Sequence, residues 1–78
     1  MSKYLVINQK CEVKEYGEMT SFGIAAMENG YVVATAHDLT DNLDQIQRLV
    51  MLFNEEELET EHFEVCIEDF LSGMLAIN

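Results

Sequence analysis

Three side chains with the chemistry of metal ligands are spaced to share one flank of a predicted C-terminal helix. His62, Cys66 and Asp69 lie at i, i+4 and i+7, which would bring an imidazole, a thiol and a carboxylate onto one stripe. A structural zinc site usually has four ligands, so His37 or Cys11 would have to approach from another element. We favour the simpler interpretation, in which Cys66 is a core residue and the other two are solvated. The sequence therefore predicts no metal and no cofactor, with these three residues as the ligands if a metal is bound.

Catalytic chemistry has one candidate pair, His37 and Asp38, a base followed by a carboxylate that could orient it. Adjacent residues of a strand point to opposite faces, so these two side chains would not meet. Asp38 is instead expected to accept backbone N–H bonds in the following turn. Neither Ser21 nor Ser72 lies in a nucleophile motif, and no glycine-rich phosphate loop is present. We predict no catalytic residues and a protein that is not an enzyme.

Acidic side chains dominate the second half of the chain. The net charge is −11, and residues 38–78 hold eleven acidic residues against one arginine. Direct nucleic-acid binding needs a basic face, and an anionic membrane surface attracts one, so the sequence predicts neither interaction. Glu61, Glu64 and Glu68 share one face of the last predicted helix. They would form part of a surface for a basic partner protein, unless they are simply solvated or hold Ca²⁺ loosely.

Three strands are expected to precede the helices, over residues 3–14, 19–28 and 31–38. Alternation in the first strand predicts a buried face made of Leu5, Ile7, Cys11 and Val13. Gly17 and the dipeptide Asn29-Gly30 supply the positive φ angles that tight hairpin turns require. Gly23, inside the second strand, predicts a bulge or the close approach of another backbone. The strands should therefore form an antiparallel meander.

Two helices are expected over residues 41–54 and 60–75. The apolar positions recur with helical spacing. In the first helix they are Leu43, Ile46, Leu49, Val50 and Phe53, and in the second Phe63, Cys66, Ile67, Phe70, Leu71 and Met74. We expect Thr40 or Asp41 to cap the first helix and Thr60 the second. Met51 and Leu52 fall outside the apolar face, which predicts a second burial surface or a homodimer.

These elements predict one small α+β domain spanning residues 1–78, a three-stranded antiparallel meander followed by two helices packed on one face (β-β-β-α-α). No apolar run approaches the roughly 20 residues of a membrane-spanning helix, and the N-terminal apolar stretch is too short for a signal peptide. We expect a cytoplasmic protein whose two cysteines are reduced.

Three strings carry a resemblance. They are Phe-Gly-Ile at residues 22–24, His-Asp-Leu-Thr at residues 37–40, and His-Phe-Glu-Val-Cys-Ile-Glu-Asp-Phe-Leu at residues 62–71. They are similar to the central strand, the strand-to-helix corner and the closing helix of a small bacterial family, found mostly in clostridia-like Gram-positive bacteria and catalogued as a domain of unknown function. That family usually has a proline before its last helix, which this chain lacks. The resemblance implies a fold and no activity.

We therefore predict a non-enzymatic, cytoplasmic interaction or regulatory module that acts through its acidic helical half, on a partner protein or a second copy. Glu61, Glu64 and Glu68, with Met51 and Leu52, are the predicted interaction residues. One alternative is a small metal-binding protein, and another is an acidic mimic of nucleic acid that occupies a basic protein.

Overall fold

The computed structural model describes residues 2–13, 15 and 17–73, which form one sheet followed by helices. The elements are β1 (Ser2–Val13), β2 (Gly17–Glu28), β3 (Tyr31–Thr40), α1 (Leu43–Glu55), the 3-10 turn η1 (Thr60–His62) and α2 (Phe63–Leu71). The strands lie in the order β1-β2-β3, and both pairs are antiparallel. This confirms the predicted α+β class and the β-β-β-α-α order.

The β2–β3 turn uses the residues predicted for it, whereas Gly17, expected in the first turn, begins β2 and pairs with Val13. Asn29 and Gly30 have φ angles of 53° and 84°, so both central positions of the β2–β3 turn are left-handed, as a type I′ turn requires. Gly17, at the start of β2, has a φ of 78°. Residues 14 and 16 of the first turn lie outside the described residues.

Gly23 marks a bulge in the neighbouring strand, as its position in β2 predicted. The β2–β3 register shifts between Phe22 and Ile24, where β3 contains extra residues. A Cβ atom at Gly23 would lie 2.1 Å from the carbonyl oxygen of Ala36, so only glycine leaves room for the bulged backbone. Asp38, in the bulge, has a φ of 55°. Its carboxylate accepts a hydrogen bond from the Ser21 hydroxyl rather than the backbone N–H bonds that we expected.

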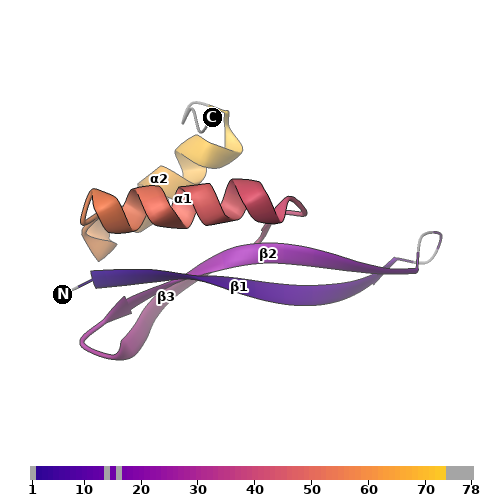
Figure 1. The fold of residues 1–78 in the computed structure, drawn as a ribbon, viewed down its shortest axis with the longest axis horizontal. Coiled ribbons are helices and arrows are strands. Elements are labelled where there is room, and N and C mark those ends of the chain that lie inside the picture. The colour runs from indigo at the N-terminus through magenta and orange to yellow at the C-terminus, as the bar shows by residue number, and fades with distance from the viewer. Residues whose placement is uncertain (1, 14, 16, 74–78) are drawn as a thin grey trace.

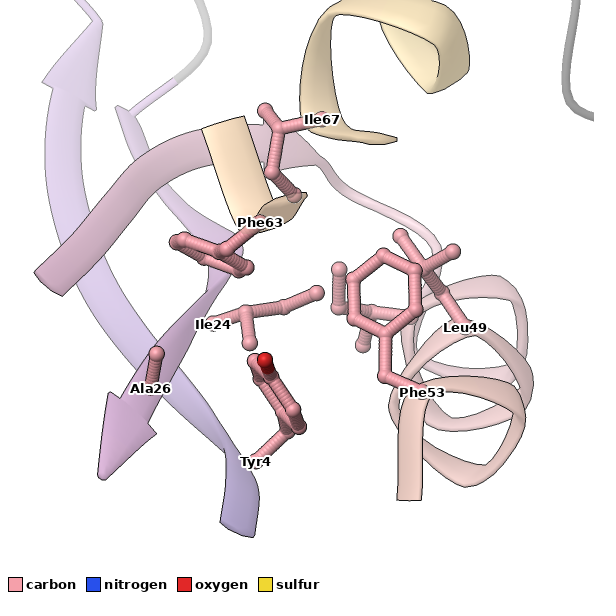
Figure 2. Packing of buried hydrophobic residues seen from close by; sticks show 8 residues of the cluster. Tyr4, Ile24, Ala26, Leu49, Phe53, Phe63 and Ile67 are labelled. Carbon is pink, nitrogen blue, oxygen red and sulfur yellow. The ribbon is translucent and has the colours of Figure 1, made fainter. Parts of the chain in front are cut away.

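The helices cover one face of the sheet, and the core lies between the two layers (Figure 1). Figure 2 shows the buried apolar side chains pointing into this space from strands and helices. They are Tyr4, Ile24, Ala26, Ile46, Leu49, Phe53, Phe63 and Ile67. The ring of Tyr4 lies 5.4 Å from that of Phe53 and 5.6 Å from that of Phe63, centroid to centroid, within the range of favourable aromatic pairs. One aromatic cluster therefore joins β1, α1 and α2.

The predicted buried face of β1 is wrong. Tyr4 is 1% exposed and Val6 packs against the core, whereas Leu5 is 40% exposed on the other side. Cys11 and Val13 lie in the part of β1 whose side chains are not described. Tyr4, Leu5, Val6 and Ile7 are all apolar, so alternation alone could not distinguish the two faces.

Asn54 reinforces the register that places Tyr4 inward. The backbone N–H of Tyr4 donates to Asn54 Oδ1 at 2.8 Å, and Asn54 Nδ2 donates to the Tyr4 carbonyl oxygen at 3.0 Å. The Tyr4 hydroxyl donates to the carbonyl oxygen of Leu58 at 2.7 Å. These three bonds attach the end of α1 and the loop after it to the edge of the sheet.

Both predicted helix starts need correction. Asn42, not Thr40 or Asp41, caps α1, because its Oδ1 accepts the Gln45 N–H at 3.1 Å. Thr40 supports this cap by accepting the Asn42 N–H.

The last helix also differs from the prediction of one helix over residues 60–75. Thr60 begins a 3-10 turn and α2 starts at Phe63, with no side-chain cap. α2 ends at Leu71, which is 60% exposed and thus not part of the core. Gly73, with a φ of 74°, follows the helix, and Met74 lies outside the described residues.

The opposite face of the sheet, here called the open face, has none of the described helices over it (Figure 1). Alternation from Tyr4 and Ile24, together with the strand register, assigns a set of apolar residues to it, and the register shift between Ala26 and Met27 places the adjacent Val32 and Val33 on the same side. They are Leu5, Ile7, Ala25, Met27, Val32 and Val33. The far part of the β1–β2 hairpin also extends beyond the helices (Figure 1).

Candidate functional site

The helical layer presents an acidic surface to solvent. Nine carboxylates in this layer belong to exposed residues and define what we call the acidic surface. They are Asp41, Asp44, Glu55, Glu56, Glu57, Glu59, Glu61, Glu64 and Glu68. Arg48 pairs with Asp44 at 3.0 Å, one helical turn apart. Among the described residues, no lysine or arginine lies within ion-pair distance of the other eight. The surface therefore carries a net negative potential.

The end of α1 directs three of these glutamates outward. The N–H of Glu57 donates to the Asn54 carbonyl oxygen, and the N–H of Leu58 donates to that of Phe53 at 3.0 Å, which is a Schellman motif. Glu57 occupies its left-handed position with a φ of 50°, where glycine is usual. Leu58 packs against the core and anchors the turn, so Glu55, Glu56 and Glu57 face solvent.

A second concentration of charge lies at the start of the C-terminal helical segment. His62 Nε2 lies 3.9 Å from a Glu59 carboxylate oxygen and 3.8 Å from one of Glu61. A side-chain hydrogen bond to Glu61, together with repulsion from its charge, raises the pKa of Glu59, while His62 acts in the opposite direction. A cation beside these two carboxylates, whether a basic side chain or a metal ion, would reduce the repulsion between them.

The structure brings only one of the predicted metal ligands into a group with others. Among the described residues, the cluster whose ligand atoms lie within 4.8 Å of one another is Glu59, Glu61 and His62, all exposed. Cys66 and Asp69 are not part of it. Burial, with a smaller effect of the Asp69 charge, raises the pKa of the Cys66 thiol, which disfavours the thiolate that metals bind. The sequence reasoning missed Glu59, because residues 59–62 do not follow the helical spacing on which that reasoning relied.

The predicted catalytic pair lies apart from this surface, in the bulge of β3. The Asp38 carboxylate accepts a hydrogen bond from the Ser21 hydroxyl, and the His37 side chain is exposed. Ser21 is buried, so its oxygen is shielded from a substrate. The pair between Ser21 and Asp38 stabilises the bulge.

Met51 and Leu52 differ in their exposure. Met51 is 59% exposed on α1 and, with Val6 and Val50, lines a shallow hollow between α1 and β1. Leu52 is half-buried. Met51 is therefore the accessible member of the predicted pair.

In the part of the chain that the structure describes, no helix is both long enough and apolar enough to cross a lipid bilayer. Comparisons of the chain with protein-family models, with curated proteins and with solved structures give no match.

Proposed function

We propose that the protein is a cytoplasmic, non-enzymatic interaction module whose acidic surface binds a basic partner protein. The observation that carries this proposal is the absence of a lysine or arginine partner for eight of its nine exposed carboxylates among the described residues. Exposed pairs contribute little individually, but a concentrated field of one sign accelerates and orients association with a partner of the opposite sign.

Two triple variants test this proposal with the same change of net charge. Glu55→Gln/Glu56→Gln/Glu57→Gln removes three carboxylates from the acidic surface. Glu12→Gln/Glu15→Gln/Glu18→Gln removes three from the β1–β2 hairpin, away from the helices. After the partner is identified by cross-linking in cells that express the protein, its dissociation constant is measured by calorimetry. The helical triple should weaken binding about 10-fold and the hairpin triple less than about 2-fold.

Salt gives an independent readout. Because the contact is between opposite charges, raising the salt concentration from about 50 to about 300 mM should weaken binding several-fold. An affinity that is independent of salt, or equal effects of the two triples, would contradict the proposal. If nucleic acid competes for the same partner, the acidic surface acts as a mimic of nucleic acid, which is the narrower form of this proposal.

Metal binding is the second candidate, and the geometry of Glu59, Glu61 and His62 favours it. An exposed site with three ligands would bind Zn²⁺ weakly, and His62→Gln should abolish the binding. Calorimetric titration of Zn²⁺ into wild type, His62→Gln and Cys66→Ala separates this cluster from the set of ligands predicted from the sequence. Identical heats for wild type and His62→Gln would remove this candidate.

A further inference from the structure

The open face of the sheet is more apolar than is usual for a face in contact with water. Antiparallel sheets with one wet face alternate apolar and polar residues, whereas strands covered on both faces have continuous apolar runs. Each strand here contains such a run, at residues 4–7, 24–27 and 31–34. Leu5 is 40% and Val32 57% exposed, and the strand register places both on the open face. The strands thus have the composition of a sheet covered on both sides.

Charge on the open face is confined to its two ends. Among the described strand residues, two charged residues lie on this side. Lys3 is placed here by the strand register, and Asp38 by its hydrogen bond to Ser21. Lys3 pairs with Met27, and Asp38 lies beside Ser21, so the two charges are offset by six positions along β2. At about 3.3 Å per residue, the cation and the anion are roughly 20 Å apart, with the apolar residues between them.

This arrangement is complementary to itself. An isologous dimer places the same patch of both copies face to face, so each charged end must meet an opposite charge. A two-fold axis that lies between the two sheets and runs obliquely across the strands brings Lys3, on the β1 edge of each copy, over the opposite corner of the other copy, which carries Asp38 of β3. The same rotation places the apolar middle of one sheet on that of the other, as in two sheets packed face to face. A dimer formed through the helical layers would instead bring two acidic surfaces together, and these would repel each other.

We propose that a second copy of this chain covers the open face, forming a two-layered sheet dimer with the helices on the outside. Three strands spaced about 4.8 Å apart, over the roughly 20 Å between the two charges, give an apolar footprint of roughly 300 Å² per copy. The pair would bury about 600 Å², below the range of stable interfaces, so the dimer should be weak and form only at high micromolar concentrations. The acidic surfaces stay free in this dimer, so the inference is independent of the proposed basic partner.

Sedimentation velocity from about 5 to about 500 µM tests the dimer with a matched pair of variants. Leu5→Glu puts a charge in the middle of the open face. Met51→Glu makes the same change of charge on α1, on the far side of the sheet, at a residue that is 59% exposed. Wild type and Met51→Glu should dimerise as concentration rises, and Leu5→Glu should remain monomeric. Lys3→Glu should weaken the dimer about 10-fold, because it removes two symmetric attractions at once.

A second variant keeps the test decisive if Leu5→Glu does not fold. Val32→Glu lies on the same face at a more exposed position and should also be monomeric, while its thermal melt stays within a few degrees of wild type. Wild type that remains monomeric at the highest concentration would overturn the proposal. A dimer that survives Leu5→Glu and Val32→Glu, or one that Met51→Glu abolishes, would do the same.

Discussion

The attachment of α1 to the edge of the sheet by a single amide gives the sharpest prediction. Asn54 both accepts from and donates to the backbone of Tyr4, at 2.8 and 3.0 Å. Asn54→Ala removes both bonds and leaves the Tyr4 N–H and C=O to water. Each bond contributes about 1 kcal/mol, and the better helix propensity of alanine offsets about 0.5 kcal/mol of this loss. We therefore expect a loss of about 1.5 kcal/mol in the free energy of unfolding.

This loss is large for a domain of this size. At roughly 0.1 kcal/mol per residue, the whole domain is stable by about 8 kcal/mol. A loss of about 1.5 kcal/mol should lower Tm by about 6–12 °C, measured by circular dichroism. Gln47→Ala is the matched control, because Gln47 is exposed on the same helix and its side chain makes no hydrogen bond to the described residues. Melts of Asn54→Ala and Gln47→Ala that agree within about 2 °C would refute the reasoning.

Asn54→Asp separates the two bonds. The aspartate can still accept from the Tyr4 N–H, but its second oxygen faces the Tyr4 carbonyl oxygen instead of donating to it. That contact should raise the pKa of the new carboxyl in the folded state. A raised folded-state pKa means that stability is present at low pH and is lost as pH rises through that value. The difference in Tm between Asn54→Asp and wild type should therefore be smaller at about pH 4 than at about pH 7.

Three further predictions concern the bulge, the core and the buried tyrosine. Gly23→Ala, whose Cβ would lie 2.1 Å from a β3 carbonyl oxygen, should cost more than about 2 kcal/mol in urea melts, whereas Gly30→Ala meets no atom and should cost about 1 kcal/mol of turn strain. Phe63→Ala should cost about 3–5 kcal/mol and the exposed Leu71→Ala less than about 0.5 kcal/mol; equal costs would disprove the placement of α2. Burial, with smaller repulsions from nearby acidic groups, raises the pKa of Tyr4, so its contribution to stability is present below about pH 10 and is lost as pH rises through the folded-state value. Tyr4→Phe should thus lose less stability than wild type between about pH 9 and pH 11, and parallel losses would contradict this.

The order of the elements could be predicted from the sequence because its signals are local. Asn29-Gly30 determines a turn within four residues, and the spacing of Ile46, Leu49 and Phe53 determines the buried face of α1. The buried face of β1 could not be predicted, because it depends on contacts with Asn54 about 50 residues away. The cap of α1 was missed for a different reason: three consecutive residues can each cap a helix, and only the geometry of the bulged corner selects Asn42.

The sequence predicted that the helical half is acidic, but not all of the residues that form the acidic surface. The net charge of residues 38–78 indicated it, and Glu61, Glu64 and Glu68 are exposed as expected. Glu55, Glu56 and Glu57 face solvent because of the left-handed turn at Glu57. Neither the helical nor the strand period predicts such a turn. Glu59 was missed because a 3-10 turn, rather than the expected α-helix, brings it beside His62.

The hairpin that extends beyond the helices should divide the molecule into two levels of hydrogen-exchange protection. Residues 9–12 and 17–20 are joined by the strand ladder and, where their side chains are described, are exposed, so no core residue is lost when the tip of the hairpin opens. Their amides should exchange through local separation of the two strands, while the amides around Ile24 exchange only when the whole domain unfolds. Since helices dominate the circular-dichroism signal, a thermal melt would record the second process and miss the first. The molecule should therefore behave as one cooperative unit in a melt and as two in an exchange experiment.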